Sequence, residues 1–438
     1  MSVSSWLRDV SLVSGPLPAV LVTGGLLGLA RLLMLRRDRA WWVRRVPLAA
    51  AVAAAATAAA WIYVDVDKPW PDGLPASAVG GGFAAVLAVA LFAAGCGRRS
   101  WPTRAGAALL ALLVVLGAAD VVDQDYGAFP NLAAALQLVP FDSADPATVL
   151  HRVSAPTLAA PGTALDRTWR APAGQPRHGA VISVRIPATR SGFPARSAWV
   201  YAPPAYLTAH RPLLPVLMLI GGQPGGTRDW LDGGQVAERM DRWADAHEGL
   251  APVVVMPDAL GSETANPLCI DSRLGADDSY LSEDVPAWVH ASLQVDPDTA
   301  HWAVGGLSFG GTCALQLAVA HPTLFPSFVD ESGQRAPDLG GRARTVRAAF
   351  GGDATAFQDV DPLRELAQHP GPTLHAYLVV GADDHTYRPQ VADVAQALRK
   401  AGDTVSWHLL PGGHSWSVWG PGFVRALSWL AGREGLTA

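Results

Sequence analysis

Cysteine is scarce in this chain, which has 3 among its 438 residues. Cys96, Cys269 and Cys313 are too few for a scaffold held together by disulfides, and their spacing does not match a metal site. Cys96 lies at the end of a hydrophobic segment, whereas Cys269 and Cys313 both lie in the later, more polar part of the chain. We therefore predict a disulfide between Cys269 and Cys313, formed in an oxidising compartment.

Motifs for metals, nucleotides and nucleic acids are also missing. The sequence contains no H-E-x-x-H zinc motif, no phosphate-binding P-loop and no dinucleotide fingerprint, so we expect neither a metal ion nor a cofactor. The net charge is −5, and no basic stripe occurs outside the hydrophobic region. We therefore expect no nucleic-acid partner.

Charge is sparse in residues 1–125, where Ala, Leu, Val and Gly dominate. Each hydrophobic segment there is close to the roughly 20 residues that cross a bilayer as a helix; they lie at about 16–35, 46–64, 77–95 and 105–122. Four such segments without a cleavage site are not a signal peptide. Because they have no polar face, buried helices of a soluble all-α domain are the weaker alternative. We predict an all-α bundle of about four transmembrane helices at 1–125.

The connections between these segments carry charges of opposite sign. Basic residues occupy the first and third connections: Arg36, Arg37, Arg39, Arg44, Arg45, Arg98, Arg99 and Arg104. Acidic residues dominate the second connection and the end of the fourth segment: Asp65, Asp67, Asp72, Asp120, Asp123 and Asp125. Basic loops stay in the cytoplasm. The sequence therefore predicts a multi-pass protein of a bacterial cell membrane, with its C-terminal domain outside the cytoplasm.

Two further regions follow the hydrophobic one. Residues 126–177 are rich in Pro and Ala and predict a linker with one short helix near 131–138. Residues 178–438 alternate between strand and helix patterns and predict an α/β domain with a mostly parallel sheet, helices on both faces and an antiparallel hairpin at its start. The expected strands are 180–187, 197–202, 213–220, 252–257, 302–305, 326–330, 374–380 and 405–410. The expected helices are 234–247, 280–293, 309–321, 342–350, 387–401 and 421–432.

A nucleophile motif lies between one of these strands and the next helix. Gly306-Leu307-Ser308-Phe309-Gly310 fits G-x-S-x-G, in which small residues let a serine occupy a strained turn with its hydroxyl exposed. The N-terminal N–H groups of the following helix would face an anion formed there. Taken alone, the motif could also be an ordinary turn in a chain with 44 glycines.

The serine needs a histidine to accept its proton and a carboxylate to orient that histidine. Both follow Ser308 in the expected order, each in a loop after a predicted strand. Asp383 and Asp384 lie in G-A-D-D-H, and His414 lies in P-G-G-H-S-W. We prefer Asp384 as the acid and keep Asp383 as the alternative. His385 follows the acid too closely to be the base.

The negative charge of a tetrahedral intermediate needs two backbone donors. Phe309 follows the nucleophile and should supply one N–H. The second should come from the loop Gly221-Gly222-Gln223-Pro224-Gly225-Gly226 after the third strand, with Gln223 as the candidate. A plain Gly/Pro turn is the alternative interpretation of that loop.

Three segments carry a resemblance to a known family: D-S-Y-L-S-E-D-V-P-A-W, the stretch around Ser308, and G-G-H-S-W-S-V-W-G. Over about residues 180–432 they resemble the esterase D family of α/β-hydrolases, and most of all the actinobacterial secreted mycolyltransferases. The resemblance implies an acyl-enzyme on Ser308 and places Asp229, Trp230 and Trp416 near an acyl or sugar-binding cleft. The mycolyltransferases differ in using a glutamate as the acid and in being released from the membrane.

These features together favour a membrane-anchored, outward-facing serine esterase or acyltransferase that acts on a lipid or glycolipid ester of the cell envelope. One alternative is a receptor or sensor that retains the hydrolase fold without catalysis, which the complete Ser, Asp and His set disfavours. A serine peptidase of the same fold is the other, and the H-S-W-x-x-W-G resemblance disfavours it.

Overall fold

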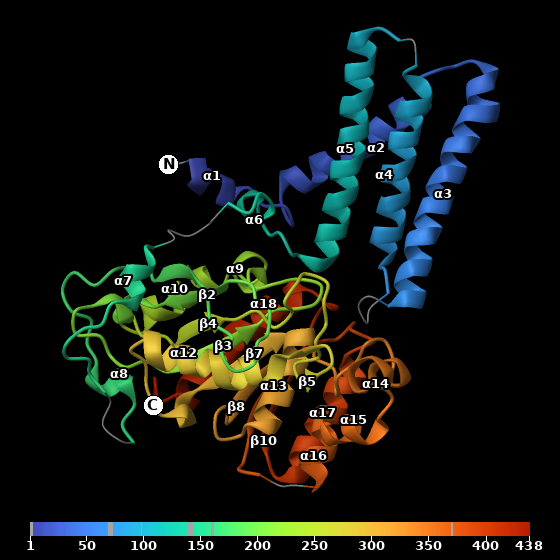
Figure 1. Cartoon of the computed structure of the whole chain (residues 1–438). Coiled ribbons are helices and arrows are strands. Elements are labelled where there is room, and N and C mark those ends of the chain that lie inside the picture. The colour runs from blue at the N-terminus through green and yellow to red at the C-terminus, as the bar shows by residue number, and fades with distance from the viewer. Residues whose placement is uncertain (1–2, 69–72, 98, 139–143, 159–161, 369–370) are drawn as a thin grey trace. The chain divides into compact units, whose positions relative to one another are not determined.

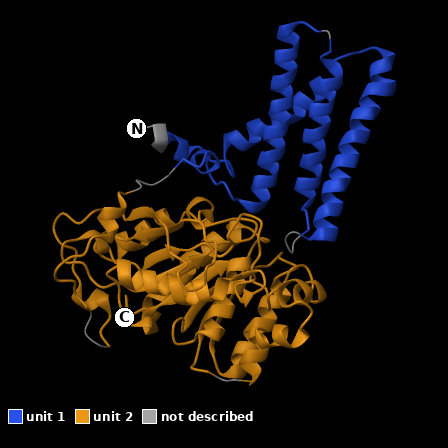
Figure 2. Cartoon of the chain, viewed as in Figure 1, with its two compact units in different colours: residues 1–140 blue, residues 141–438 orange. Residues whose placement is uncertain are grey.

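The chain forms two compact units, residues 1–140 and 141–438 (Figures 1 and 2). The computed structural model describes residues 3–68, 73–97, 99–138, 144–158, 162–368 and 371–438. Within the first unit, four helical segments are long and apolar enough to cross a membrane, in agreement with the four predicted hydrophobic segments. They are α2 (Pro16–Leu33), α3 (Val46–Ile62) with its π-helical extensions η1 (Trp41–Arg45) and η2 (Tyr63–Asp67), α4 (Ala76–Gly95) and α5 (Trp101–Tyr126).

Glycines allow the backbones of α2 and α5 to approach closely. A Cβ on Gly28 would lie 2.9 Å from the carbonyl oxygen of Leu110, and a Cβ on Gly117 would lie 2.6 Å from that of Leu21. Small residues at helix contacts are typical of bundles in lipid, where packing drives association. In the apolar stretch of each helix, only 11% to 28% is buried inside the protein. Most of the apolar surface of these helices therefore faces outward, as it would in helices that contact lipid.

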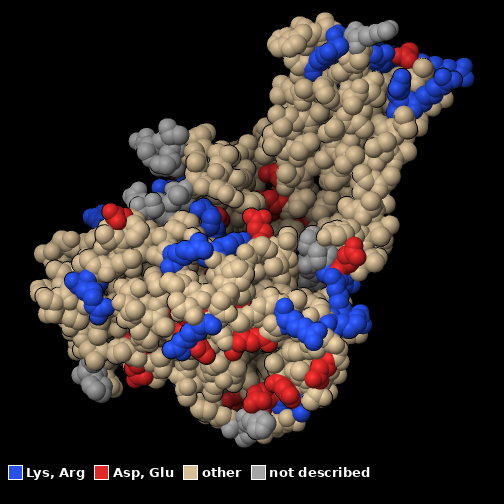
Figure 3. Space-filling model, in the orientation of Figure 1, with Lys and Arg blue, Asp and Glu red and all other residues tan. Residues whose placement is uncertain are grey.

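Most of the basic side chains of the first unit gather at one end of its helices (Figure 3). They lie between the end of α2 and the start of α3, and around the start of α5. Arg36 donates hydrogen bonds to the carbonyl oxygen of Gly95 at the end of α4, at 3.3 and 3.4 Å. At the opposite end, the short helices α1 (Val3–Asp9) and α6 (Leu132–Ala135) lie side by side. The segment that follows α1 is joined to the segment that precedes α6 by a hydrogen bond from the Leu12 N–H to Pro130 O, at 3.1 Å.

Of the predicted linker 126–177, residues 141–177 belong to the second unit. They include α7 (Pro146–Leu150) and α8 (Leu165–Thr168), and Val149, Leu165 and Trp169 are buried in the core of that unit. The backbone N–H groups of Leu165 and Asp166 also donate to Gly435 O and Leu436 O, at 2.9 and 3.0 Å. Apolar side chains scattered among the prolines therefore dock this segment onto the α/β domain.

The second unit is built on an eight-stranded sheet with the order β1-β2-β4-β3-β7-β8-β9-β10. β2 runs antiparallel to its neighbours β1 and β4, and the other pairs are parallel. This confirms the predicted mostly parallel sheet that opens with an antiparallel hairpin. The strands are β1 (Ala180–Val184), β2 (Ala198–Ala202), β3 (Val216–Ile220), β4 (Val253–Met256), β7 (Ala303–Leu307), β8 (Ser327–Glu331), β9 (His375–Gly381) and β10 (Thr404–Leu410), with a small hairpin of β5 (Asp271–Ser272) and β6 (Gly275–Ala276) apart from the sheet.

Helices cover both faces of the sheet (Figure 1). On β8, Asp330 contacts Gly311 of α13 (Phe309–Ala320), and Glu331 contacts Gly422 of α18 (Trp416–Arg433). Successive side chains of a strand point to opposite faces, so α13 and α18 lie on opposite sides. The remaining helices are α9 (Asp229–Asp232), α10 (Val236–Ala246), α11 (Asp277–Ser279), α12 (Val285–Ser292), α14 (Arg342–Phe350), α15 (Ala354–Asp359), α16 (Pro362–Gln368) and α17 (Arg388–Ala401), with the shorter turns η3 (Pro204–Leu207), η4 (Tyr280–Asp284) and η5 (Thr299–His301).

The start of the last helix differs most from the sequence-based expectation. α18 begins at Trp416 rather than at residue 421, and Pro421 lies inside it. Proline is common in the first turn of a helix, which makes Pro421 a plausible start in the sequence alone. In the structure Trp416, Val418 and Trp419 are buried, so packing extends the helix by more than a turn on the N-terminal side of the proline.

Candidate active site

Ser308 lies at the sharp turn between β7 and α13. Its backbone angles are φ 53° and ψ −117°, a conformation that costs a non-glycine residue roughly 1–3 kcal/mol. A Cβ on Gly306 would collide with the backbone of Gly310, and a Cβ on Gly310 would collide with the carbonyl oxygen of Ile220. The two glycines of G-x-S-x-G are therefore required by close backbone approach. The turn aims the serine side chain away from the sheet at the C-terminal end of β7.

His414 links Ser308 to Asp384 through two hydrogen bonds. Its Nε2 lies 2.9 Å from Ser308 Oγ, and its Nδ1 lies 2.8 Å from Asp384 Oδ2. His414 comes from the loop between β10 and α18, and Asp384 from the loop between β9 and α17. The three residues are separated by up to 106 positions in the chain, yet they form one continuous line.

Two aromatic side chains hold the imidazole of His414 in place. Tyr387 stacks on it with ring centroids 4.1 Å apart, and Trp419 meets it edge to face at 4.8 Å. The backbone N–H of Tyr387 also donates to Asp384 Oδ1 at 3.0 Å. The indole N–H of Trp419 donates to Ser332 Oγ at 3.2 Å. Neither aromatic residue is among the site residues expected from the sequence, although the spacing W-x-x-W after His414 contains Trp419.

The structure places the two neighbouring aspartates differently. Asp384 is 4% exposed and faces His414, whereas the side chain of Asp383 is exposed. His385 is exposed as well. The turn that separates the two aspartates is fixed by the backbone N–H of Asp384, which donates to Gly381 O at 3.2 Å.

The loop after β3 lies beside the nucleophile. A Cβ on Gly222 would come within 3.9 Å of Ser308 Cβ. The next residue, Gln223, is 6% exposed, and its side-chain amide bonds to Thr264 O at 3.1 Å and to Asn266 Nδ2 at 3.2 Å. Phe309 is the first residue of α13, so its N–H has no partner one turn earlier in the helix.

Asp229, Trp230 and Trp416, which are expected near a substrate cleft, all make contacts within the protein. Trp230 is 1% exposed, and its indole N–H donates to Ile220 O at 2.9 Å. Trp416 is 9% exposed; it packs over Gly233 and Gly234 and meets Trp230 edge to face at 5.4 Å. The Asp229 carboxylate faces backbone N–H groups of the loop after β3. All three side chains are engaged within the protein.

Cys269 and Cys313 form a disulfide, with Cα atoms 5.3 Å apart. Cys313 lies on α13, five positions after Ser308, and Cys269 lies in the long connection after β4. The disulfide therefore ties that connection to the helix that follows the nucleophile. Cys96 in the first unit is buried and has a free thiol.

Two carboxyl groups on β8 lie under the nucleophile turn. The backbone N–H of Ser308 donates to the carbonyl oxygen of Glu331 at 2.8 Å. Burial raises the pKa of Asp330 to about 7, against a hydrogen bond from the Gly333 N–H. Burial also raises the pKa of Glu331 far above its usual range, although the positive charge of Arg239 opposes this. Both groups therefore keep their protons to a higher pH than exposed carboxyls.

The arrangement suits nucleophilic acyl chemistry. An imidazole that is bonded to a hydroxyl on one side and to a carboxylate on the other can take the hydroxyl proton and remain oriented while it is charged. Among the residues that the structure describes, no three His, Cys, Asp or Glu side chains gather as metal ligands.

Residues 195–430 match the protein family described as "Putative esterase". Over 441 aligned residues the chain is 32% identical to an uncharacterized protein of Corynebacterium glutamicum. The alignment covers 98% of this chain and 99% of that protein. Among solved structures, a ferulic acid esterase is 18% identical with a TM-score of 0.49, covering 59% of this chain and 99% of its own. An S-formylglutathione hydrolase of Agrobacterium tumefaciens is 20% identical with a TM-score of 0.46, covering 59% of this chain and 96% of its own.

Proposed function

The chain belongs to the esterase family that its residues 195–430 match and is an enzyme of the serine hydrolase class; we propose that Ser308, His414 and Asp384 are its catalytic triad. The observation that carries this proposal is the unbroken line of hydrogen bonds from Ser308 Oγ through His414 to Asp384, at 2.9 and 2.8 Å. The three residues come from separate loops, each at the carboxyl end of a strand of the sheet.

In the proposed reaction, Ser308 Oγ attacks the carbonyl carbon of an ester while His414 Nε2 takes the hydroxyl proton. The carbonyl electron pair moves onto oxygen, where the backbone N–H groups of Phe309 and Gln223 stabilise the negative charge. When the tetrahedral intermediate collapses, His414 returns the proton to the departing alcohol and the acyl group stays on Ser308. Water or a second hydroxyl then attacks the acyl-enzyme, with His414 again as the base.

The proposed substrate is a lipid or glycolipid ester of the cell envelope, reached from the outer face of the cytoplasmic membrane. Four apolar helices in the same chain support anchoring. The basic connections at one end of these helices favour a cytoplasmic position for that end. The Cys269–Cys313 disulfide supports an oxidising location for the α/β unit.

A fluorophosphonate probe tests the nucleophile. We expect membranes that contain the protein to show a labelled band, and Ser308→Ala to remove it along with hydrolysis of a p-nitrophenyl ester. Ser327→Ala is the matched control, because Ser327 is a buried serine on the neighbouring strand β8. Labelling that survives in Ser308→Ala would end the proposal, and a wild-type protein that neither labels nor hydrolyses esters would favour the receptor alternative.

Alkaline phosphatase fusions test the orientation, because this reporter folds only outside the bacterial cytoplasm. We expect activity from fusions after Asp67 and after the C-terminal residue, and none from fusions after Arg45 or Arg104. Asp67 lies at one end of the long helices, and Arg45 and Arg104 lie near the other. The reverse pattern would place the α/β unit in the cytoplasm and rule out an envelope substrate.

A further inference from the structure

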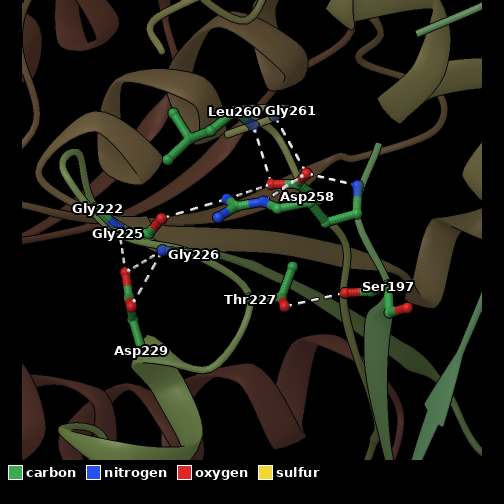
Figure 4. A network of polar contacts seen from close by, with 10 residues as sticks. Ser197, Gly222, Gly225, Gly226, Thr227, Asp229, Asp258, Leu260 and Gly261 are labelled. Carbon is green, nitrogen blue, oxygen red and sulfur yellow. Dashed lines mark hydrogen bonds and ion pairs between the residues drawn. The ribbon is translucent and has the colours of Figure 1, made fainter. Parts of the chain in front are cut away.

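The loop after β3, residues 221–226, is held by charged side chains that the reaction does not use (Figure 4). Asp229 lies at the start of α9 and reaches back into the loop. Its Oδ2 accepts the backbone N–H of Gly222 at 3.2 Å, and both its oxygens accept the N–H of Gly226 at 3.1 Å. A Cβ on Gly221 would lie 2.8 Å from Asp229 Oδ2, so the carboxylate fills the inside of the turn.

A second clamp fixes the far side of the same loop. Arg196 donates to the carbonyl oxygen of Gly225 at 3.2 Å and pairs with both oxygens of Asp258 at 2.7 and 3.0 Å. Asp258 is 1% exposed and also accepts N–H groups of Arg196, Leu260 and Gly261. Gly225 is therefore held from a second side by this charged pair.

These contacts restrict one peptide unit in particular. The N–H of Gly222 is bonded to Asp229, and the side chain of Gln223 is bonded to Thr264 and Asn266. Between these two fixed points lies the peptide that joins Gly222 to Gln223, which carries the Gln223 N–H. Because the peptide unit is planar, its N–H can turn away only through coupled changes of the Gly222 ψ and Gln223 φ angles, and the hydrogen bonds on both flanks oppose those changes.

We propose that Asp229 is a positioning residue for the oxyanion hole: its carboxylate holds the Gly222–Gln223 peptide so that the Gln223 N–H faces the oxygen of the tetrahedral intermediate. This inference rests on the proposed function, because it assigns a role within the same reaction. Preorganised donors of this kind need no rearrangement when the negative charge develops.

The charge state of Asp229 gives the inference a separate readout. Desolvation raises the pKa of Asp229 to about 7, with the N–H groups of Gly226 and Gly222 opposing the shift. Of the charged groups around it, Asp232 on α9 raises this pKa and Arg196, which precedes β2, lowers it. Below about pH 7 the carboxyl gains a proton and accepts hydrogen bonds less well, so the loop loses its restraint as the pH falls.

Three variants test the inference in the full-length protein: Asp229→Ala, Asp229→Asn and Asp232→Asn. We expect Asp229→Ala to lower kcat for a p-nitrophenyl ester by about 10²-fold with little change in KM, the size of loss expected when a catalytic group is misplaced. An alkyl boronic acid, which mimics the tetrahedral intermediate, should lose affinity by the same factor. Asp229→Asn retains one acceptor oxygen and should fall between Asp229→Ala and the wild type.

Asp232→Asn is the matched control. Asp232 lies on the same short helix, is 8% exposed and pairs with Arg228 at 2.8 Å, without a contact to the loop among the described hydrogen bonds. We expect it to leave kcat and boronic acid affinity close to the wild-type values.

The pH profile separates positioning from a merely structural role. In the wild type, the carboxyl of Asp229 gains a proton as the pH falls through about 7, and its hydrogen bonding then resembles that of an asparagine. The ratio of the wild-type kcat to that of Asp229→Asn should therefore shrink toward one as the pH falls. Unchanged kcat and boronic acid affinity in Asp229→Ala would overturn the inference, as would a ratio that does not change with pH if the alanine variant does not fold. If either of these results is found while Ser308→Ala is inactive, only the role of Asp229 is refuted and the proposed triad is retained. If Ser308→Ala is active, the proposed triad itself is refuted.

Discussion

Replacement of Ser308 or His414 by alanine is expected to lower kcat for ester hydrolysis by about 10⁶-fold, and replacement of both is expected to cost no more than either alone. The reason is the direct hydrogen bond between the two side chains, with His414 Nε2 2.9 Å from Ser308 Oγ. Without the base the hydroxyl stays protonated, and without the hydroxyl the base has nothing to activate. The measurement is a comparison of kcat for the two single variants and the double variant on the same p-nitrophenyl ester.

The control for this comparison is His385→Ala, since His385 is exposed and follows Asp384 directly in the chain. It should retain the wild-type rate. Independent losses that multiply in the double variant would show that Ser308 and His414 do not act as one unit. The residual rate should still exceed that of water by roughly 10³- to 10⁴-fold, because the oxyanion donors and substrate binding remain.

The second large effect is expected for Asp384→Asn, which should lower kcat by about 10⁴-fold. Asp384 Oδ2 lies 2.8 Å from His414 Nδ1, and its other oxygen accepts the Tyr387 N–H at 3.0 Å. Asparagine has the same shape but presents an amide where the imidazolium needs a negative charge. It also favours the tautomer that leaves Nε2 protonated and unable to act as a base.

Asp383→Asn provides the matched comparison. It removes the same charge from the preceding residue, whose side chain is exposed. We expect its kcat to stay within about twofold of the wild-type value, since an exposed charge contributes little. A large loss in Asp383→Asn with a small one in Asp384→Asn would reassign the acid. Equal moderate losses would indicate that the charge of the loop matters more than either hydrogen bond.

Much of the α/β unit can be predicted from the sequence because its strands are buried on both faces. Runs such as V-L-M-L-I in β3 and V-V-V-M in β4 are continuously apolar, as central parallel strands are. Segments whose order depends on tertiary contacts are harder to predict. Val149 and Leu165 sit among prolines in a stretch with weak periodicity, and their burial depends on surfaces formed by residues far along the chain.

The chemical groups of the site are likewise predictable from their order and from the strands that precede them. The supporting contacts are not. Arg196 and Asp258 are separated by 62 positions, so the pattern around either residue does not indicate the pair. The ring contact between Trp230 and Trp416, which packs α9 against α18, is likewise not indicated by the motifs that these residues flank. The choice between Asp383 and Asp384 depends on a single turn of backbone.

The bonds from Leu165 and Asp166 to Gly435 and Leu436 also bear on the order in which the α/β unit folds. They join positions about 270 residues apart, and a loop of that length loses much conformational entropy when it closes. Closure is far less costly once the sheet and α18 have brought the two segments near each other. The stretch that leads from the N-terminal helices into the α/β unit should therefore dock late, so the hydrolase would assemble its sheet and candidate site before this stretch packs against them.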